Sequence, residues 1–138
     1  MATPNITIRE TREIALPQLL NLYRANGWSS AKKPQQLIAA LMNSHKLVSA
    51  WEEDLLVGLG NSLSDGHLVV YYPHLLVLPS HHGKGIGHMI MERLQKDYAG
   101  FHSQILVSDQ AAIEFYKSCG FSKAGQTVPM WIYEGDDH

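Results

Sequence analysis

Cysteine is almost absent from this chain, and an excess of basic charge and a long apolar run are absent too. The single cysteine, Cys119, excludes an internal disulfide and a zinc site built from several cysteines. Eleven basic and thirteen acidic side chains leave a net charge of −2, which lacks the basic footprint of a nonspecific nucleic-acid-binding protein. No apolar run approaches the roughly 20 residues of a membrane-spanning helix. Nor do the first ten residues place an apolar core behind a basic head, so no signal peptide is expected.

These absences predict a cytoplasmic protein with no nucleic-acid partner and no membrane partner. The chain has 138 residues, of which 45% are apolar and 17% charged, so we expect one folded domain over residues 1–138.

The pattern of apolar residues predicts an α/β fold around one mixed sheet. Two helices start near Pro17 and Pro34, because proline suits the first turn of a helix. Pro73 interrupts a long apolar run and predicts a bulge or an edge position there, since proline has no N–H to donate. The expected strands are residues 5–9, 47–51, 55–64, 68–78, 104–107 and 128–133, and two further helices start at Gly85 and at Asp109, which can cap its helix.

A glycine-rich turn follows the long apolar strand and precedes a helix. Here Gly83, Gly85 and Gly87 alternate with Lys84 and Ile86. Glycine lets the backbone turn sharply, and the start of a helix offers unpaired N–H groups and a positive dipole end. The turn therefore predicts a phosphate or pyrophosphate site. A Walker loop is excluded because Gly85 stands where Ser or Thr is required, and the glycine spacing differs from the dinucleotide fingerprint.

Residues 77–94, VLPSHHGKGIGHMIMERL, resemble the coenzyme-binding signature of the GNAT superfamily of N-acetyltransferases. Gly85 and Gly87 match that signature, whereas His82 stands where Gln or Arg is usual. Residues 109–121, DQAAIEFYKSCGF, resemble a second family segment, in which Tyr116 matches and Asp109 replaces the common Asn. The resemblance implies a single-domain GNAT fold: a mixed, largely antiparallel sheet, flanked by about four helices and split between the fourth and fifth strands.

The resemblance also implies that acetyl-CoA is the co-substrate and lies in this split. Its pantetheine arm would pair like an added strand with the main chain of Leu75, Leu76 and Val77. Lys84 could add charge, and Asp109 would stand beside the pantetheine arm. The pyrophosphate contacts would come from the loop and the first helical turn, namely His82, Gly83, Lys84, Gly85, Ile86, Gly87 and His88.

The reaction implied is direct attack of a neutral primary amine on the thioester carbonyl. Tyr116 matches the family tyrosine that lies near the coenzyme sulfur and protonates it. A main-chain N–H near Leu75 or Leu76 would stabilise the oxyanion. His74 is the first candidate base, because the pKa of histidine is near 6.5, and a structural role for it stays open. Weaker candidates for the base are Tyr72, His67 and Asp65.

The acceptor amine is predicted to be a small molecule such as an aralkylamine or a polyamine. Its pocket would be framed by the first two helices, the fourth strand and the last hairpin, with Tyr23, Trp28, Tyr72 and Trp131 as wall residues. Tyr71 and Met130 are further candidates, although only one of Tyr71 and Tyr72 can face the pocket. Core packing alone could also explain these aromatic residues.

Other function classes stay open at this point. A catalytically silent acyl-CoA-binding sensor or regulatory module is the alternative function, and the replacements at His82 and Asp109 motivate it. A homodimer is compatible with the resemblance. No metal is expected, because the spacing of His81, His82 and His88 fits no zinc pattern.

Overall fold

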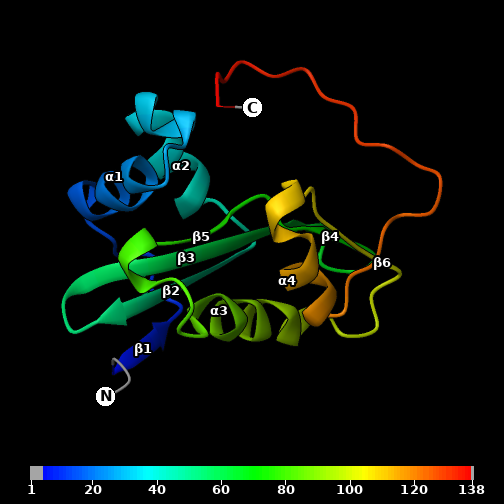
Figure 1. Cartoon of the computed structure of the whole chain (residues 1–138), viewed down its shortest axis with the longest axis horizontal. Coiled ribbons are helices and arrows are strands. Elements are labelled where there is room, and N and C mark those ends of the chain that lie inside the picture. Colours follow the sequence, from blue (N-terminus) through cyan, green and yellow to red (C-terminus); the bar gives the residue numbers. More distant parts are fainter. Residues whose placement is uncertain (1–4, 138) are drawn as a thin grey trace.

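The computed structural model describes residues 5–137 and contains a mixed sheet with helices on both of its faces (Figure 1). The strand order is β1-β2-β3-β4-β6, and β5 pairs with β3 beside β4. Neighbouring strands are antiparallel except for β4 and β6, which are parallel. The strands are β1 (Ile6–Arg9), β2 (Lys46–Glu52), β3 (Leu55–Ser64), β4 (Val69–Tyr71), β5 (Leu75–Val77) and β6 (Ser103–Ile105).

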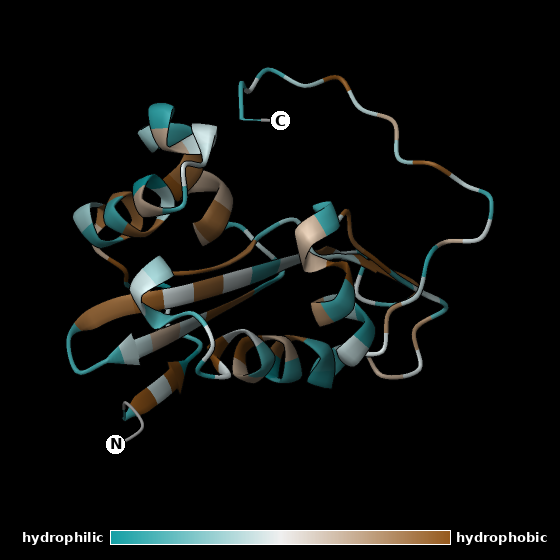
Figure 2. Ribbon diagram, in the orientation of Figure 1, coloured by the Kyte–Doolittle hydropathy of each residue, from teal (hydrophilic) through white to brown (hydrophobic). Residues whose placement is uncertain are grey.

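Two helices lie on one face of the sheet and one on the other (Figure 1). The first pair is α1 (Leu16–Ala25) and α2 (Pro34–Met42), and both helices have a proline in their first turn as predicted. The 3₁₀ turn η1 (Ser29–Lys32) joins them. The opposite face carries α3 (Ile86–Gln95), and α4 (Ile113–Ser118) follows β6. The apolar strands lie between these layers, so the core forms on both sides of the sheet (Figure 2).

Two glycines of β3 let α3 approach the sheet closely. A Cβ atom at Gly58 would lie 2.8 Å from the Ile90 Cδ1 atom. A Cβ atom at Gly60 would lie 2.8 Å from both Ile90 and Leu94. Any side chain at these positions would therefore push α3 outward, and α3 carries the loop that precedes it.

The predicted strand 68–78 is interrupted, as Pro73 indicated. It divides into β4 and β5, which pair with different parts of β3. Between the pairs Gly60–Leu75 and Leu63–Tyr71, two residues of β3 (61–62) stand opposite three residues (72–74). This extra residue is a β-bulge, which bends the strand locally.

The sheet opens directly after this bulge. The Tyr72 N–H donates to the Ile105 carbonyl oxygen at 3.0 Å, where β6 ends. Beyond that point the chain continues as β5, which within residues 5–137 pairs with β3 alone. The split between the fourth and fifth predicted strands thus separates β5 from the chain that follows β6.

Two local predictions at the C-terminal end are wrong. Residues 128–133 form no strand, because no neighbouring strand pairs with them in the described part of the chain. Asp109 does precede a helical segment, the 3₁₀ turn η4 (Gln110–Ala112) that continues into α4. However, its carboxylate makes no capping hydrogen bond.

Candidate active site

The glycine loop, residues 82–85, joins the 3₁₀ turn η2 (Pro79–His81) to α3 and is exposed. Gly83 and Gly85 have φ angles of +77° and +79°, in the left-handed region that glycine adopts most easily. The first hydrogen bond of α3 runs from the Met89 N–H to the Gly85 oxygen. The N–H groups before Met89 therefore have no acceptor within the helix, which is the arrangement that binds an anion.

The side chain of His82 turns back from this loop onto β5. Its Nε2 atom lies 2.9 Å from the Val77 carbonyl oxygen. Since a carbonyl oxygen only accepts, the imidazole donates from Nε2 in this contact. His82 therefore ties the loop to the end of β5, a contact that the sequence motif did not predict.

The main chain of β5 presents an open edge to the split. The groups that face β3 belong to His74, Leu76 and Leu78, as the bonds from Asn61 N–H to His74 oxygen and from Leu78 N–H to Val57 oxygen indicate. Backbone groups alternate in direction along a strand. The N–H and carbonyl groups of Leu75 and Val77 consequently point away from β3, toward the split.

Helix α4 docks against the first turn of α3. A Cβ atom at Gly87 would lie 3.0 Å from the Phe115 ring, so a side chain there would need the ring to shift by a few tenths of an ångström. The His88 Nε2 atom lies 2.7 Å from the Ser118 Oγ atom, and its ring lies 4.6 Å from that of Phe115. The His88 side chain therefore contacts α4, and its main-chain N–H lies among the groups of the first helical turn that could bind a ligand.

Tyr116 lies on α4 between two aromatic rings. Its ring meets those of Phe115 and Phe121 edge-on, with centroids 5.1 Å and 6.2 Å away. Burial, with smaller contributions from Cys119 and Asp109, raises the pKa of Tyr116 to about 12. The hydroxyl group is therefore protonated at pH 7, as a proton donor must be.

A second aromatic cluster joins α1 to the bulge. The Tyr23 hydroxyl lies 2.7 Å from His74 Nδ1, and the Trp28 ring stands edge-on to both rings. Burial raises the pKa of Tyr23 and lowers the pKa of His74 to about 4. The Tyr23 hydroxyl therefore stays protonated and donates a hydrogen bond to Nδ1 of a neutral imidazole, whose single N–H is then on Nε2.

Asn61 holds the bulge from the other side, and the sequence analysis did not single it out. Its Oδ1 atom accepts the His74 N–H at 3.0 Å, and its Nδ2 atom donates to Ser44 Oγ at 2.9 Å. The signal that could have found it is an amide side chain directly after the apolar and glycine residues 55–60 of the same strand.

Two predicted wall residues lie elsewhere. Tyr72 is buried, donates its hydroxyl to Gln104 Oε1 at 2.7 Å, and packs against Tyr98 and Phe121. Trp131 is 64% exposed and stacks on Tyr133 in the segment after α4. Neither residue joins the cluster of Tyr23, Trp28 and His74, because each is held by a different part of the chain.

Comparison with known families identifies this arrangement. The family model described as the acetyltransferase (GNAT) domain matches residues 16–130. The chain belongs to the GNAT acetyltransferase family. It is therefore an acyl-CoA N-acetyltransferase, and members of this family use acetyl-CoA and bind CoA.

Solved GNAT structures share the fold over nearly the whole chain. A GNAT-family acetyltransferase from Streptococcus pneumoniae is 30% identical, with a TM-score of 0.80 over 94% of this chain and 99% of that one. Glucosamine-6-phosphate N-acetyltransferase from Arabidopsis thaliana is 16% identical, with a TM-score of 0.71 over 94% and 99%. An aminoglycoside N-acetyltransferase in complex with CoA is 13% identical, with a TM-score of 0.71 over 94% and 95%. The last two likenesses show the fold alone.

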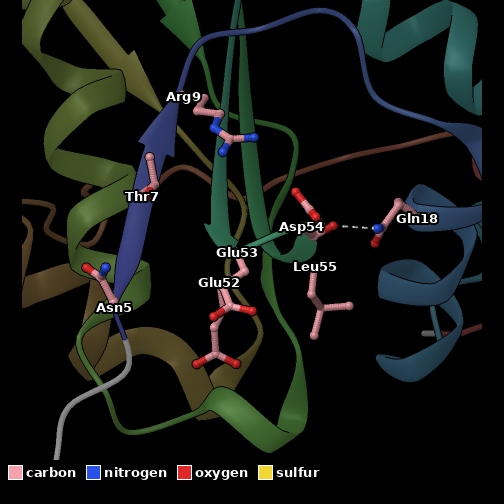
Figure 3. Close-up of a pocket in the computed structure, with 8 residues that line it drawn as sticks. All are labelled: Asn5, Thr7, Arg9, Gln18, Glu52, Glu53, Asp54 and Leu55. Carbon is pink, nitrogen blue, oxygen red and sulfur yellow. Dashed lines mark hydrogen bonds between the residues drawn. The ribbon is translucent and has the colours of Figure 1, made fainter.

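A hollow of about 720 Å³ lies outside the GNAT site, at the turn between β2 and β3 (Figure 3). Arg9, the acidic turn Glu52–Asp54 and α1 surround it, and none of its lining residues is a predicted site residue. Among residues 5–137, no three His, Cys, Asp or Glu side chains group as metal ligands. No helix in the described part of the chain has the length and apolar character needed to cross a bilayer.

Proposed function

We propose that this GNAT enzyme transfers the acetyl group of acetyl-CoA to the primary amine of a small molecule by direct attack. The observation that carries the proposal is the cluster of Tyr23, Trp28 and His74 at the bulge, next to the open edge of β5. An aromatic wall beside a thioester site suits the apolar stem of an aralkylamine or a polyamine.

The glycine loop and β5 would hold the coenzyme. Main-chain N–H groups from Gly83 to His88 would bind the pyrophosphate, and exposed Lys84 would add a positive charge. The Leu75 carbonyl oxygen and the Val77 N–H would pair with the pantetheine amides, as an added strand does, whereas the Val77 carbonyl oxygen already accepts from His82. Acetyl-CoA would supply the activated acyl group.

The Leu75 N–H, Tyr116 and His74 would then act on the reacting atoms. The amine nitrogen bonds to the carbonyl carbon as the carbon–sulfur bond breaks. The Leu75 N–H, beside the bulge, would donate to the developing oxyanion. Tyr116 would give its proton to the leaving sulfur, and its raised pKa of about 12 keeps that proton in place until then.

His74 is our candidate to accept the proton that the amine releases. Its lowered pKa of about 4 leaves the ring neutral at pH 7. Its acceptor nitrogen, Nδ1, already accepts the Tyr23 hydroxyl, so the proton would travel through that hydroxyl: Tyr23 would take the proton of the amine as it passes its own proton to Nδ1. The lowered pKa also makes His74 a weak base, and we expect it to pass the proton on to water.

We further propose a cytoplasmic location for this enzyme.

The first test measures CoA release from acetyl-CoA with a thiol reagent across an amine panel. The panel holds aralkylamines, polyamines, amino acids, a lysine peptide and amino sugars. Amino sugars are included because two similar structures are named for glucosamine-6-phosphate and aminoglycosides. Turnover with an aralkylamine or a polyamine supports the proposal, and turnover confined to the lysine peptide contradicts the small-molecule acceptor.

The second test replaces Tyr116 by Phe, which keeps the ring contacts and removes the hydroxyl. We expect turnover to fall about 10²- to 10⁴-fold, the usual contribution of a general acid. Binding of acetyl-CoA, measured by its thermal shift, should be retained. Unchanged turnover would remove the acid role of Tyr116.

A further inference from the structure

Three histidines flank the glycine loop, and the proposed chemistry does not use their side chains. His81 ends η2, His82 opens the loop, and His88 lies in the first turn of α3. Their spacing fits no zinc pattern. Their ring nitrogens instead bond to three different elements of the fold, namely β2, β5 and α4.

The two glycines of the loop have open space around them. A Cβ atom at Gly83 or Gly85 would meet no heavy atom within 4 Å apart from its own chain neighbours, and the loop is exposed. Glycine also has the widest choice of backbone angles, so such a loop samples many conformations unless its ends are held. The flanking histidine side chains supply bonds that hold these ends.

His81 holds the turn before the loop to β2. Its side chain is buried, its Nε2 atom lies 3.2 Å from the Glu52 Oε1 atom, and its Nδ1 atom lies 2.8 Å from the Ser80 Oγ atom. A carboxylate oxygen only accepts, so Nε2 donates to Glu52, and in a neutral ring Nδ1 accepts the Ser80 hydroxyl. Glu52 ends β2 and lines the hollow of Figure 3, outside the GNAT site. This bond therefore links η2 to a strand that does not border the split.

His88 holds the other end of the loop to α4. The Ser118 hydroxyl gives its one proton to the Phe115 carbonyl oxygen, so its oxygen accepts from His88 Nε2. His82 adds the third bond, from its Nε2 to the Val77 carbonyl oxygen of β5. All three histidines thus donate from Nε2 to acceptors within the protein. The main-chain N–H groups of the loop remain for a ligand, as the proposed coenzyme site requires.

We propose that His81, His82 and His88 are positioning residues for the coenzyme, which hold the glycine loop in its binding conformation through bonds to β2, β5 and α4. Their role rests on the proposed function, because the loop is the part that would bind the pyrophosphate. A glycine loop that is free before binding loses its conformational freedom when it binds, and this loss weakens binding. A loop whose ends are already held loses less, so each bond contributes to the affinity for CoA.

Glu52 offers the sharpest test, because it bonds to His81 and lies outside the GNAT site. Calorimetry measures the Kd of CoA for the intact chain and for each variant. Glu52→Ala removes the acceptor of His81 and should raise this Kd about threefold to tenfold, the usual contribution of one hydrogen bond. Glu52→Gln keeps an oxygen that accepts from His81 and should restore most of the affinity. The control Glu53→Ala removes the same charge from the same exposed turn and should bind CoA as the intact chain does.

The other two bonds are tested in the same assay. Ser118→Ala removes the acceptor of His88 on α4, and the exposed Ser122→Ala is its matched control. His82→Leu removes the donor to Val77, whereas His82→Gln keeps an N–H at that position. We expect Ser118→Ala and His82→Leu each to raise the Kd about threefold to tenfold, and His82→Gln to raise it less. Each bond has its own variant, so the remaining bonds decide where one variant folds poorly.

The melting temperature of each ligand-free variant separates positioning of the loop from stability alone. Variants that melt at a lower temperature but keep the Kd of the intact chain would overturn the positioning role. Equal affinity of Glu52→Ala and Glu53→Ala, or no recovery of affinity in Glu52→Gln, would overturn it as well. An intact chain that does not bind CoA at all would overturn the proposed coenzyme site together with this role, which distinguishes the two failures.

Discussion

Acid should weaken this fold through one buried ring, that of His74. Burial lowers its pKa to about 4, whereas an exposed histidine titrates near 6.5. At a pH between these two pKa values, His74 binds a proton in the unfolded chain but not in the folded chain, so protons favour unfolding. The stabilising contribution is therefore complete above pH 6.5 and is lost as the pH falls toward 4.

The size of this effect follows from the difference between the two pKa values. About 2.5 pKa units correspond to roughly 3 kcal/mol of unfolding free energy, or about 1.4 kcal/mol for each pH unit in that window. The geometry agrees with the direction, because His74 Nδ1 already accepts the Tyr23 hydroxyl at 2.7 Å. A proton on Nδ1 would break that hydrogen bond.

Urea unfolding at pH 7.5, 6.0 and 4.5 measures this contribution when the intact chain is compared with His74→Gln. Glutamine does not titrate, and its amide oxygen can still accept the Tyr23 hydroxyl. The intact chain should lose about 2–3 kcal/mol more than His74→Gln between pH 7.5 and 4.5. The exposed His102→Gln is the matched control and should follow the intact chain. Parallel pH curves for the intact chain and His74→Gln would refute the reasoning.

Three further substitutions probe the support and the charge of the site. Gly60→Ala should lower the free energy of unfolding in urea by about 1–3 kcal/mol, because its Cβ would lie 2.8 Å from Ile90 and Leu94. An unchanged free energy of unfolding would show that α3 shifts at little cost. Gly85→Ala forces a side chain onto a φ of +79° and should weaken CoA binding in calorimetry, and equal affinity would argue against a role of this loop in binding. Lys84→Gln should weaken CoA binding at low salt and matter less at 0.5 M salt, so an effect that salt leaves unchanged would exclude a charge contact.

The helices and most strands could be predicted from the sequence because their signals are local. Proline at the start of α1 and α2 and the alternation of Ile6 and Ile8 with polar residues in β1 act within a few residues. Pro73 indicated the bulge for the same reason. Residues 128–133 do not form the predicted strand, because a two-residue period indicates only which way side chains point. A strand also needs a neighbouring strand to pair with, and the local pattern does not show which one that would be.

The glycine loop could be foreseen in the same local way, since glycine is the residue that adopts positive φ easily. The pairing of Tyr23 with His74 could not, because it joins two residues 51 positions apart. Tyr72 was expected in the acceptor wall, but its partner Gln104 belongs to a separate strand. Aromatic composition cannot distinguish a ring in the core from a ring in a pocket.

Asn61 holds the opening in the sheet in place in the absence of a ligand. Its side-chain oxygen takes the hydrogen bond of the His74 N–H, while its own N–H bonds to the His74 carbonyl oxygen. Both backbone groups of His74 are thus bonded without any ligand, and the opening beside β5 is already present in the folded chain. Binding there requires no strand to separate, so little of the binding free energy is lost to reorganisation. The enzyme with and without coenzyme should then show the same pairing of β3 with β5.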